Sequence, residues 1–174
     1  ETLFLRALFY FELVQMFGDV PLITQVPQSV SEVTEYPAQA TQEEIYAFIA
    51  ADLKKAAEIM PKDKWNAIVS GEGHATRWAA QALLARVFLF YTGFYGKTEL
   101  PLMDEEFNIT GTVTKTEVIT ALEDCINNSG HTLVNDYRRL WPYSNSLSAK
   151  DYYYVADLKN KGEYWFKDGS NPET

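Results

Sequence analysis

The sequence has few of the residues from which disulfide frameworks and metal sites are built. It contains one cysteine, Cys125, and two histidines among 174 residues. A single cysteine excludes an internal disulfide framework. His74 and His131 each follow a glycine and have no second ligand at metal-binding spacing, so we interpret both as turn residues. The sequence therefore predicts no metal site.

Positive charge and long apolar runs are also scarce. Fifteen Lys and Arg residues stand against 24 Asp and Glu residues, which gives a formal net charge of −9. This balance argues against a nucleic-acid-binding surface, because such a surface needs clustered basic residues. The most apolar stretch, Leu3–Phe17, is interrupted by Arg6, Glu12 and Gln15, so it does not predict a membrane-spanning helix. With 47% hydrophobic residues, the chain can form one domain with its own core.

Catalytic and cofactor signatures are missing as well. The sequence has no nucleophile-elbow motif, phosphate-binding loop or dinucleotide fingerprint. The acidic groups at Asp104–Glu106 and Glu123–Asp124 could serve glycoside hydrolysis only if two carboxylates faced each other across a ligand. Nothing in the sequence places them so, and we interpret them as solvated surface. We therefore expect no catalytic residues, no cofactor and no enzymatic activity.

Helical periodicity is the main signal that the sequence does contain. Four helices are predicted: Glu1 to Phe17, the capping box Thr41–Glu44 to Pro61, Thr76 to Tyr95, and the capping box Thr114–Glu117 to Gly130. The first is apolar almost all round, which is typical of a helix packed on two sides. The fourth carries Cys125 on its apolar stripe, with Val118, Ile119, Leu122 and Ile126. We expect this thiol to be buried as a small hydrophobic residue.

The segment "FGDVPLI", residues 17–23, ends the first helix abruptly. Gly18 can adopt the positive φ that closes a helix, and Pro21 cannot continue one. Val20 precedes a proline and is therefore biased toward an extended backbone. The sequence predicts a helix stop followed by an extended stretch.

The spacing of the second and third helices indicates stacked helix pairs. The segments that contain them begin near Thr41 and Ala75, 34 residues apart, as in tetratricopeptide repeats. We expect them to pack antiparallel, with Ala79 and Ala82 receiving an apolar stripe formed by Ile45, Phe48, Ile49, Leu53, Ala56, Ala57 and Met60. The connections 19–40 and 97–113 are long for a helical bundle and are expected to cover a surface or serve a function.

The C-terminal part is rich in aromatic residues and has no regular period. Nine aromatic residues fall between Tyr137 and Phe166. Aromatic faces stack on the apolar faces of sugar rings, but they also fill hydrophobic cores. Trp141, Tyr143 and Trp165 are the candidate ligand-binding residues by this argument.

Five blocks of sequence, in order, resemble the SusD/RagB family. These blocks are "ETLFLRALFYFELVQMFGDVPLI", "TQEEIYAFIAADLKKAAEIMP", "GHATRWAAQALLARVFLFYTGFYGK", "GHTLVNDYRRLWPYSN" and "NPET". The resemblance implies a mostly α fold of tetratricopeptide-like helix pairs joined by long loops. It implies that residues 1–174 are one incomplete SusD-like domain that lacks both ends, with a helical scaffold over 1–130 and an aromatic-rich irregular segment over 131–174.

The resemblance also implies a function. Family members bind glycans at the surface of the bacterial outer membrane, where a lipid anchors them, and deliver nutrient to a SusC-like TonB-dependent transporter. No binding residue of the family falls in the five blocks. The alternative from the residues alone is a helical-repeat scaffold that binds a peptide or protein partner, and a glycosidase is disfavoured because no carboxylate pair is placed.

Overall fold

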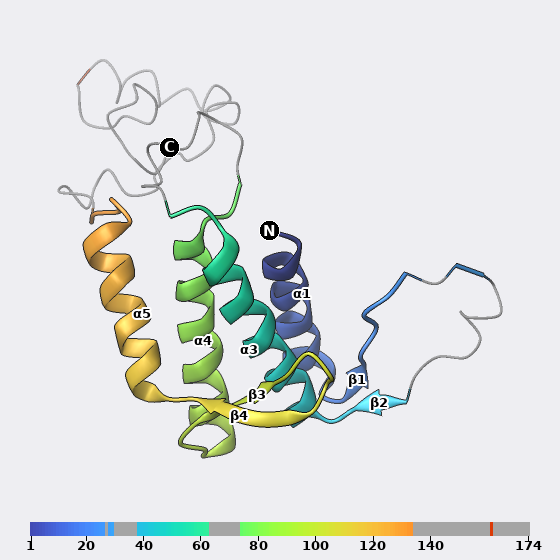
Figure 1. Cartoon of the computed structure of the whole chain (residues 1–174). Coiled ribbons are helices and arrows are strands. Elements are labelled where there is room, and N and C mark those ends of the chain that lie inside the picture. Colours follow the sequence, from blue (N-terminus) through green and yellow to red (C-terminus); the bar gives the residue numbers. More distant parts are fainter. Residues whose placement is uncertain (27, 30–37, 63–73, 134–160, 162–174) are drawn as a thin grey trace. The chain divides into compact units, whose positions relative to one another are not determined.

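The computed structural model describes residues 1–26, 28–29, 38–62, 74–133 and 161. Its helices and strands are, in chain order, α1 (Thr2–Phe17), β1 (Val20–Pro21), β2 (Gln39–Ala40), α3 (Gln42–Ile59), α4 (Arg77–Tyr95), β3 (Leu100–Met103), β4 (Ile109–Val113) and α5 (Lys115–Asn128) (Figure 1). The described part is mostly helical, as the periodicity predicts. None of its helices is both long and apolar enough to cross a bilayer.

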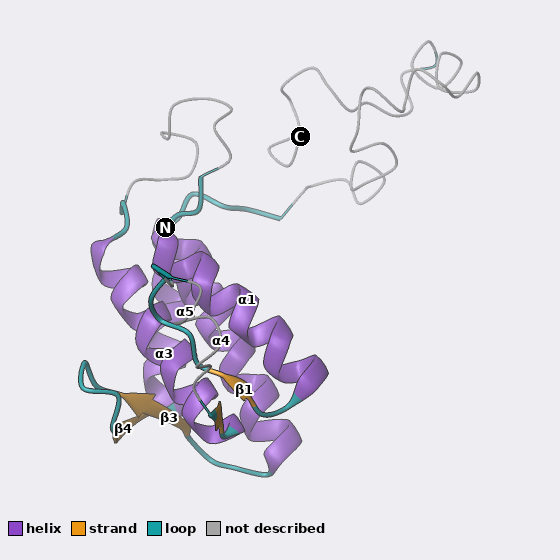
Figure 2. Cartoon of the chain, turned by 90° about the vertical axis from the view of Figure 1, so that its right-hand side faces the viewer, coloured by secondary structure: helices purple, strands orange, loops and turns teal. Residues whose placement is uncertain are grey.

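The helices lie in a row and alternate in direction. α3 packs against α1 on one side and α4 on the other, and α5 packs against α4 (Figures 1 and 2). Successive helices run antiparallel, which confirms the predicted helix-pair arrangement. All of these elements belong to a unit over Glu1–His131, and Thr132–Thr174 form a second unit. The aromatic-rich segment 131–174 lies almost wholly outside the described residues, so its irregular character stays a prediction.

The predicted capping boxes fix the starts of α3 and α5. In α3 the backbone N–H of Glu44 donates to Thr41 Oγ1 over 3.3 Å, and the Thr41 N–H donates to Glu44 Oε2 over 2.7 Å. Thr114 and Glu117 repeat this pattern in α5. The hydrogen bond from the Thr41 side chain holds the pKa of Glu44 below its usual value. Each box satisfies backbone donors that have no partner within the helix.

Gly18 and Asp19 join the end of α1 to the start of α3. Gly18 has φ 72° and ψ −120°, a backbone conformation that glycine adopts without steric cost. The Asp19 carboxylate accepts a hydrogen bond of 3.1 Å from the backbone N–H of Gln42. Val20–Pro21 is extended, as predicted, and pairs antiparallel with Gln39–Ala40. The two ends of the long connection between α1 and α3 are therefore held together by backbone pairing.

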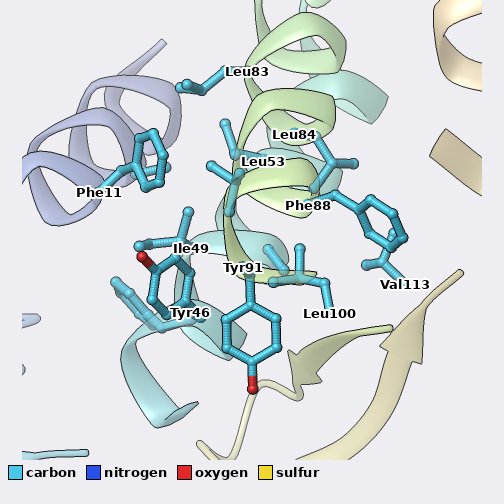
Figure 3. Close-up of a cluster of buried hydrophobic side chains, with 14 of the residues drawn as sticks. Phe11, Tyr46, Ile49, Leu53, Leu83, Leu84, Phe88, Tyr91, Leu100 and Val113 are labelled. Carbon is cyan, nitrogen blue, oxygen red and sulfur yellow. The ribbon is translucent and has the colours of Figure 1, made fainter. Parts of the chain in front are cut away.

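The hydrophobic core lies around α3. Figure 3 shows part of it, with side chains from α1, α3, α4 and the β3–β4 hairpin. The predicted stripe is too narrow, because α3 has neighbours on several sides. Its buried residues are Ile45, Tyr46, Ala47, Phe48, Ile49, Ala50, Asp52, Leu53 and Ala56.

The predicted contact face of α4 is wrong in detail. Ala80 and Ala85 are buried, whereas Ala79 is half-buried and Ala82 is exposed. Because each residue turns the helix by about 100°, Ala82 lies about 200° round the axis from Ala80. The small side chains that allow close helix packing are therefore Ala80 and Ala85.

Two helices are less covered than predicted. α1 is buried on one face only, at Ala7, Tyr10, Phe11 and Val14, and its opposite face is exposed but apolar. The large side chains of that face are Leu5, Phe9, Leu13 and Met16. In α5 the single buried helical residue is Val118, and Cys125 is half-buried rather than buried. Among the described elements, α5 has α4 as its main neighbour, which leaves most of its surface open.

The connection between α4 and α5 contains a β-hairpin that the sequence analysis does not predict. β3 and β4 pair antiparallel, with an irregularity between Leu102 and Met103. Leu100 and Val113 are fully buried, and β3 packs against α3. The hairpin therefore belongs to the core, and its turn projects beside α3.

Candidate functional site

The residues predicted as ligand-binding, Trp141, Tyr143 and Trp165, lie outside the described residues. Their role stays a prediction. His74 is described, and its Nδ1 lies 2.9 Å from a carboxylate oxygen of Glu1. No group of three or more His, Cys, Asp and Glu side chains in residues 1–26, 28–29, 38–62 and 74–133 could hold a metal ion.

A cleft of about 500 Å³ lies between α1, α3 and the turn of the β3–β4 hairpin. We call it the hairpin cleft. Ligand-binding pockets commonly have volumes of about 300–1,000 Å³, so its size is sufficient for a small molecule or one unit of a polymer. Its lining is composed of apolar and charged residues in nearly equal number.

An ion pair between α1 and α3 forms one wall of the hairpin cleft. Arg6 Nε and Nη2 donate to the two carboxylate oxygens of Asp52, each over 2.7 Å. The Asp52 side chain is 7% exposed and the Arg6 side chain 31% exposed. The hydrogen bonds to Asp52 raise the pKa of Arg6. This bidentate geometry fixes both planar groups in one orientation.

Two stacked aromatic rings form the next part of the wall. The Arg6 guanidinium lies 4.6 Å from the ring centroid of Phe48, and Phe48 is stacked on Phe107 at 6.2 Å between centroids. Phe48 is buried, whereas Phe107 is 53% exposed. The cleft therefore presents a partly open aromatic ring beside a planar polar pair.

The hairpin turn holds Phe107 in an unusual backbone conformation. Its φ is 64°, and it is the one residue other than glycine with positive φ in the described part of the chain. The Asp104 carboxylate accepts hydrogen bonds of 2.9 Å from the backbone N–H groups of Glu106 and Asn108. The Asp104 carbonyl accepts a 3.2 Å bond from the Phe107 N–H. Asp104 thus fixes the turn that places Phe107 at the cleft.

A second, smaller cavity of about 310 Å³ lies between α3, α4 and α5. Two of its lining residues contact Asp124, which accepts a 3.0 Å hydrogen bond from Gln81 Nε2 and lies 3.4 Å from Arg77 Nη2. The bond from Gln81 holds the pKa of Asp124 below its usual value. No aromatic side chain lines this cavity. We interpret it as the polar seam between α4 and α5 rather than as a binding site.

Two carboxylates of the hairpin cleft are already engaged in hydrogen bonds. Asp52 is held by Arg6, and Asp104 is held by the backbone of its own turn. Glycoside hydrolysis needs two carboxyl groups that flank the bond to be cleaved, one to protonate the leaving group and one to act as base or nucleophile. The Arg6–Asp52 pair offers hydrogen bonds to a ligand, and the Phe107 ring offers an aromatic surface.

Sequence reasoning identifies none of these residues as ligand-binding, and it considers Asp104 and Glu105 only for glycoside hydrolysis, which it disfavours. Two charged residues could have been noticed in the sequence, because each lies in an apolar helical segment. Arg6 interrupts the apolar helix α1, and Asp52 falls within a buried segment of α3. A charge at such a position predicts a buried partner but does not identify it. Phe107 has no comparable signal, because it follows an acidic run that reads as solvated surface.

The chain is similar to known SusD-like proteins. A SusD-like family model, described as "Starch-binding associating with outer membrane", matches residues 1–89. A SusD-like protein of Bacteroides ovatus is 27% identical over 151 residues, which cover 84% of this chain and 23% of that protein. SusD-like protein P2 of Formosa agariphila is 30% identical over 86 residues, which cover 49% of this chain and 17% of that protein.

Solved structures show the same fold. The crystal structure of a SusD-like protein from Bacteroides fragilis NCTC 9343 aligns with a TM-score of 0.52 at 32% identity, covering 76% of this chain and 20% of that chain. A SusD-like carbohydrate-binding protein of the same strain aligns with a TM-score of 0.58 at 23% identity, covering 80% and 23%. This second likeness concerns the fold alone. The chain spans between 17% and 23% of the length of these four proteins.

Proposed function

Because this chain belongs to the SusD-like family, as its five sequence blocks predict, we propose that the full-length protein binds glycans at the bacterial cell surface. The observation that carries this proposal is the match of residues 1–89 to a family described as starch-binding and associated with the outer membrane. The hairpin cleft supplies a physical means, since it combines an aromatic ring with a planar hydrogen-bonding pair. The protein acts in this proposal as a binding protein and not as an enzyme.

Affinity electrophoresis tests glycan binding directly. The full-length protein is run in native gels that contain soluble starch, xylan, mannan or polygalacturonate, and its mobility is compared with that in a gel without polysaccharide. We expect one or more of the polysaccharides to retard it. Chromatography of the same polysaccharides after incubation should show no shorter products. Release of oligosaccharides would contradict the binding-only proposal, and unchanged mobility in all four gels would contradict glycan binding.

The proposal extends to delivery. We infer that the protein is held at the outer membrane by a lipid anchor outside this sequence and passes its ligand to a SusC-like TonB-dependent transporter. This extension is supported by the family's description as associating with the outer membrane. A tagged full-length protein should co-purify with a TonB-dependent transporter from detergent-solubilised outer membranes, and protease added to intact cells should digest it. If the protein purifies without a TonB-dependent transporter, or if protease does not digest it in intact cells, the delivery proposal is contradicted.

The alternative function is a helical-repeat scaffold for a protein partner. The apolar outer face of α1 favours it, because Phe9 and Met16 are each more than 60% exposed among the described residues. Replacing Phe9 by Ser in the full-length protein separates the two functions. If the protein is a scaffold, Phe9→Ser should abolish co-purification of the protein partner and leave mobility in polysaccharide gels unchanged. If the protein only binds glycans, Phe9→Ser should change neither result.

A further inference from the structure

The hairpin cleft has features that core packing alone does not explain. Phe107 occupies a positive-φ position at which glycine or asparagine would be at ease, and for a phenylalanine this backbone conformation is costly. About half of its surface is still exposed, so contact with Phe48 accounts for only part of its role. Strained residues of this kind concentrate at ligand sites. The combination points to a ring that is kept there to contact a ligand.

The polar groups of the hairpin cleft suit hydroxyl groups. Two of the five N–H donors of Arg6 bind Asp52, and the carboxylate of Asp52 has further acceptor positions beyond those two bonds. The pair presents planar donors and acceptors in fixed directions, and Arg6 is partly open to the cleft. A polyol with neighbouring hydroxyl groups can both donate to and accept from such a pair.

The charges of the cleft nearly cancel. Its lining contains the cationic residues Arg6, Lys54 and Lys55 and the acidic residues Asp52, Glu58, Asp104 and Glu105. Two of the cations are engaged in ion pairs, Arg6 with Asp52 and Lys54 with Glu117. A site for an anionic ligand would show an excess of positive charge, which would raise the local concentration of that ligand. The balance therefore favours an uncharged ligand.

We propose that the hairpin cleft is a binding subsite for one ring of a neutral saccharide. The ring stacks on Phe107, and its hydroxyl groups bind the Arg6–Asp52 pair. This inference rests on the proposed glycan-binding function and adds to it a location, a stacking residue and a preference for uncharged glycans.

The test compares two phenylalanines in the full-length protein that are both exposed and both stacked on another phenylalanine. Phe107 is stacked on Phe48 inside the cleft, and Phe94 is 71% exposed and stacked on Phe90 of α4 at 5.4 Å. The variants Phe107→Ala, Phe107→Tyr and Phe94→Ala are run by affinity electrophoresis in starch, xylan, mannan and polygalacturonate. Thermal unfolding of each variant checks that it folds.

We expect a neutral polysaccharide to retard the unmodified protein. Phe107→Ala should raise the apparent dissociation constant about tenfold, as expected for loss of an aromatic contact, while Phe107→Tyr and Phe94→Ala bind normally. Normal binding by Phe107→Ala would overturn the subsite and leave glycan binding intact. Equal loss in both alanine variants, or retardation by polygalacturonate alone, would also overturn it. No retardation of the unmodified protein by any of the four would overturn the proposed function itself.

Discussion

Removing either partner of the Arg6–Asp52 pair should destabilise the protein, but by different amounts. The two side chains share two hydrogen bonds of 2.7 Å, yet Asp52 is 7% exposed and Arg6 is 31% exposed. The partner left behind determines the cost, because an unpaired buried charge loses its solvation and gains nothing in return. Water reaches an unpaired Arg6 side chain, at 31% exposure, much more readily than an unpaired Asp52 side chain, at 7%.

The magnitudes follow from this difference in burial. Arg6→Met strands the Asp52 carboxylate in the α1–α3 interface and should cost about 3–5 kcal/mol, the range for a broken buried pair. Asp52→Asn keeps one acceptor for the guanidinium and leaves a partly solvated cation, so about 1–2 kcal/mol is expected. The double variant Arg6→Met with Asp52→Leu should recover much of the loss, since it leaves no buried charge.

Chemical denaturation followed by circular dichroism measures these free energies in the full-length protein. Lys54→Met is the matched control, because the Lys54–Glu117 pair has a 3.0 Å contact but side chains that are 35% and 47% exposed. That control should cost less than about 1 kcal/mol. A cost for Asp52→Asn equal to or above that for Arg6→Met would refute the argument from burial.

Three further predictions concern the helical scaffold. Thr41→Ala and Thr114→Ala should each lower the free energy of unfolding by about 1 kcal/mol in the same denaturation assay, because each removes a helix cap. The folded-state pKa of Glu44 is below the ordinary 4.5, so its contribution is present above that pH and is lost as pH falls through the folded pKa. Glu44→Gln should therefore flatten the decline in the unfolding midpoint as the pH falls below 4.5. Ala80→Phe should cost about 1–3 kcal/mol by overpacking, and Ala82→Phe should be nearly neutral.

The features that sequence alone could predict are those encoded by neighbouring residues. Both capping boxes, the stop at Gly18 and the extended Val20–Pro21 segment depend on residues at most four positions apart, and all are confirmed. The number and order of the described helices follow from the same local signals. Local signals could not identify the Arg6–Asp52 pair, whose members are 46 residues apart.

Burial was harder to predict than helix position. The stripe of α5 has the spacing of a core-facing helix, yet Ile119 and Ile126 are exposed because one main neighbour covers the helix within the described residues. The face of α4 that meets α3 was misassigned to Ala82 because several small residues share the segment. Periodicity shows which residues lie on one face, but the position of neighbouring helices determines which face is buried.

The hairpin between α4 and α5 was missed for a reason that bears on function. β3 contains Pro101, which disfavours a strand assignment, and the turn carries phenylalanine where a hairpin with positive φ ordinarily has glycine or asparagine. Among the described residues, Phe107 is the one residue other than glycine with positive φ, so it is a point of conflict between local sequence and backbone conformation. Such conflicts are expected where a residue is retained for a purpose other than folding. The same residue, Phe107, therefore helps to explain why the sequence does not predict the hairpin and places an aromatic ring near the Arg6–Asp52 pair.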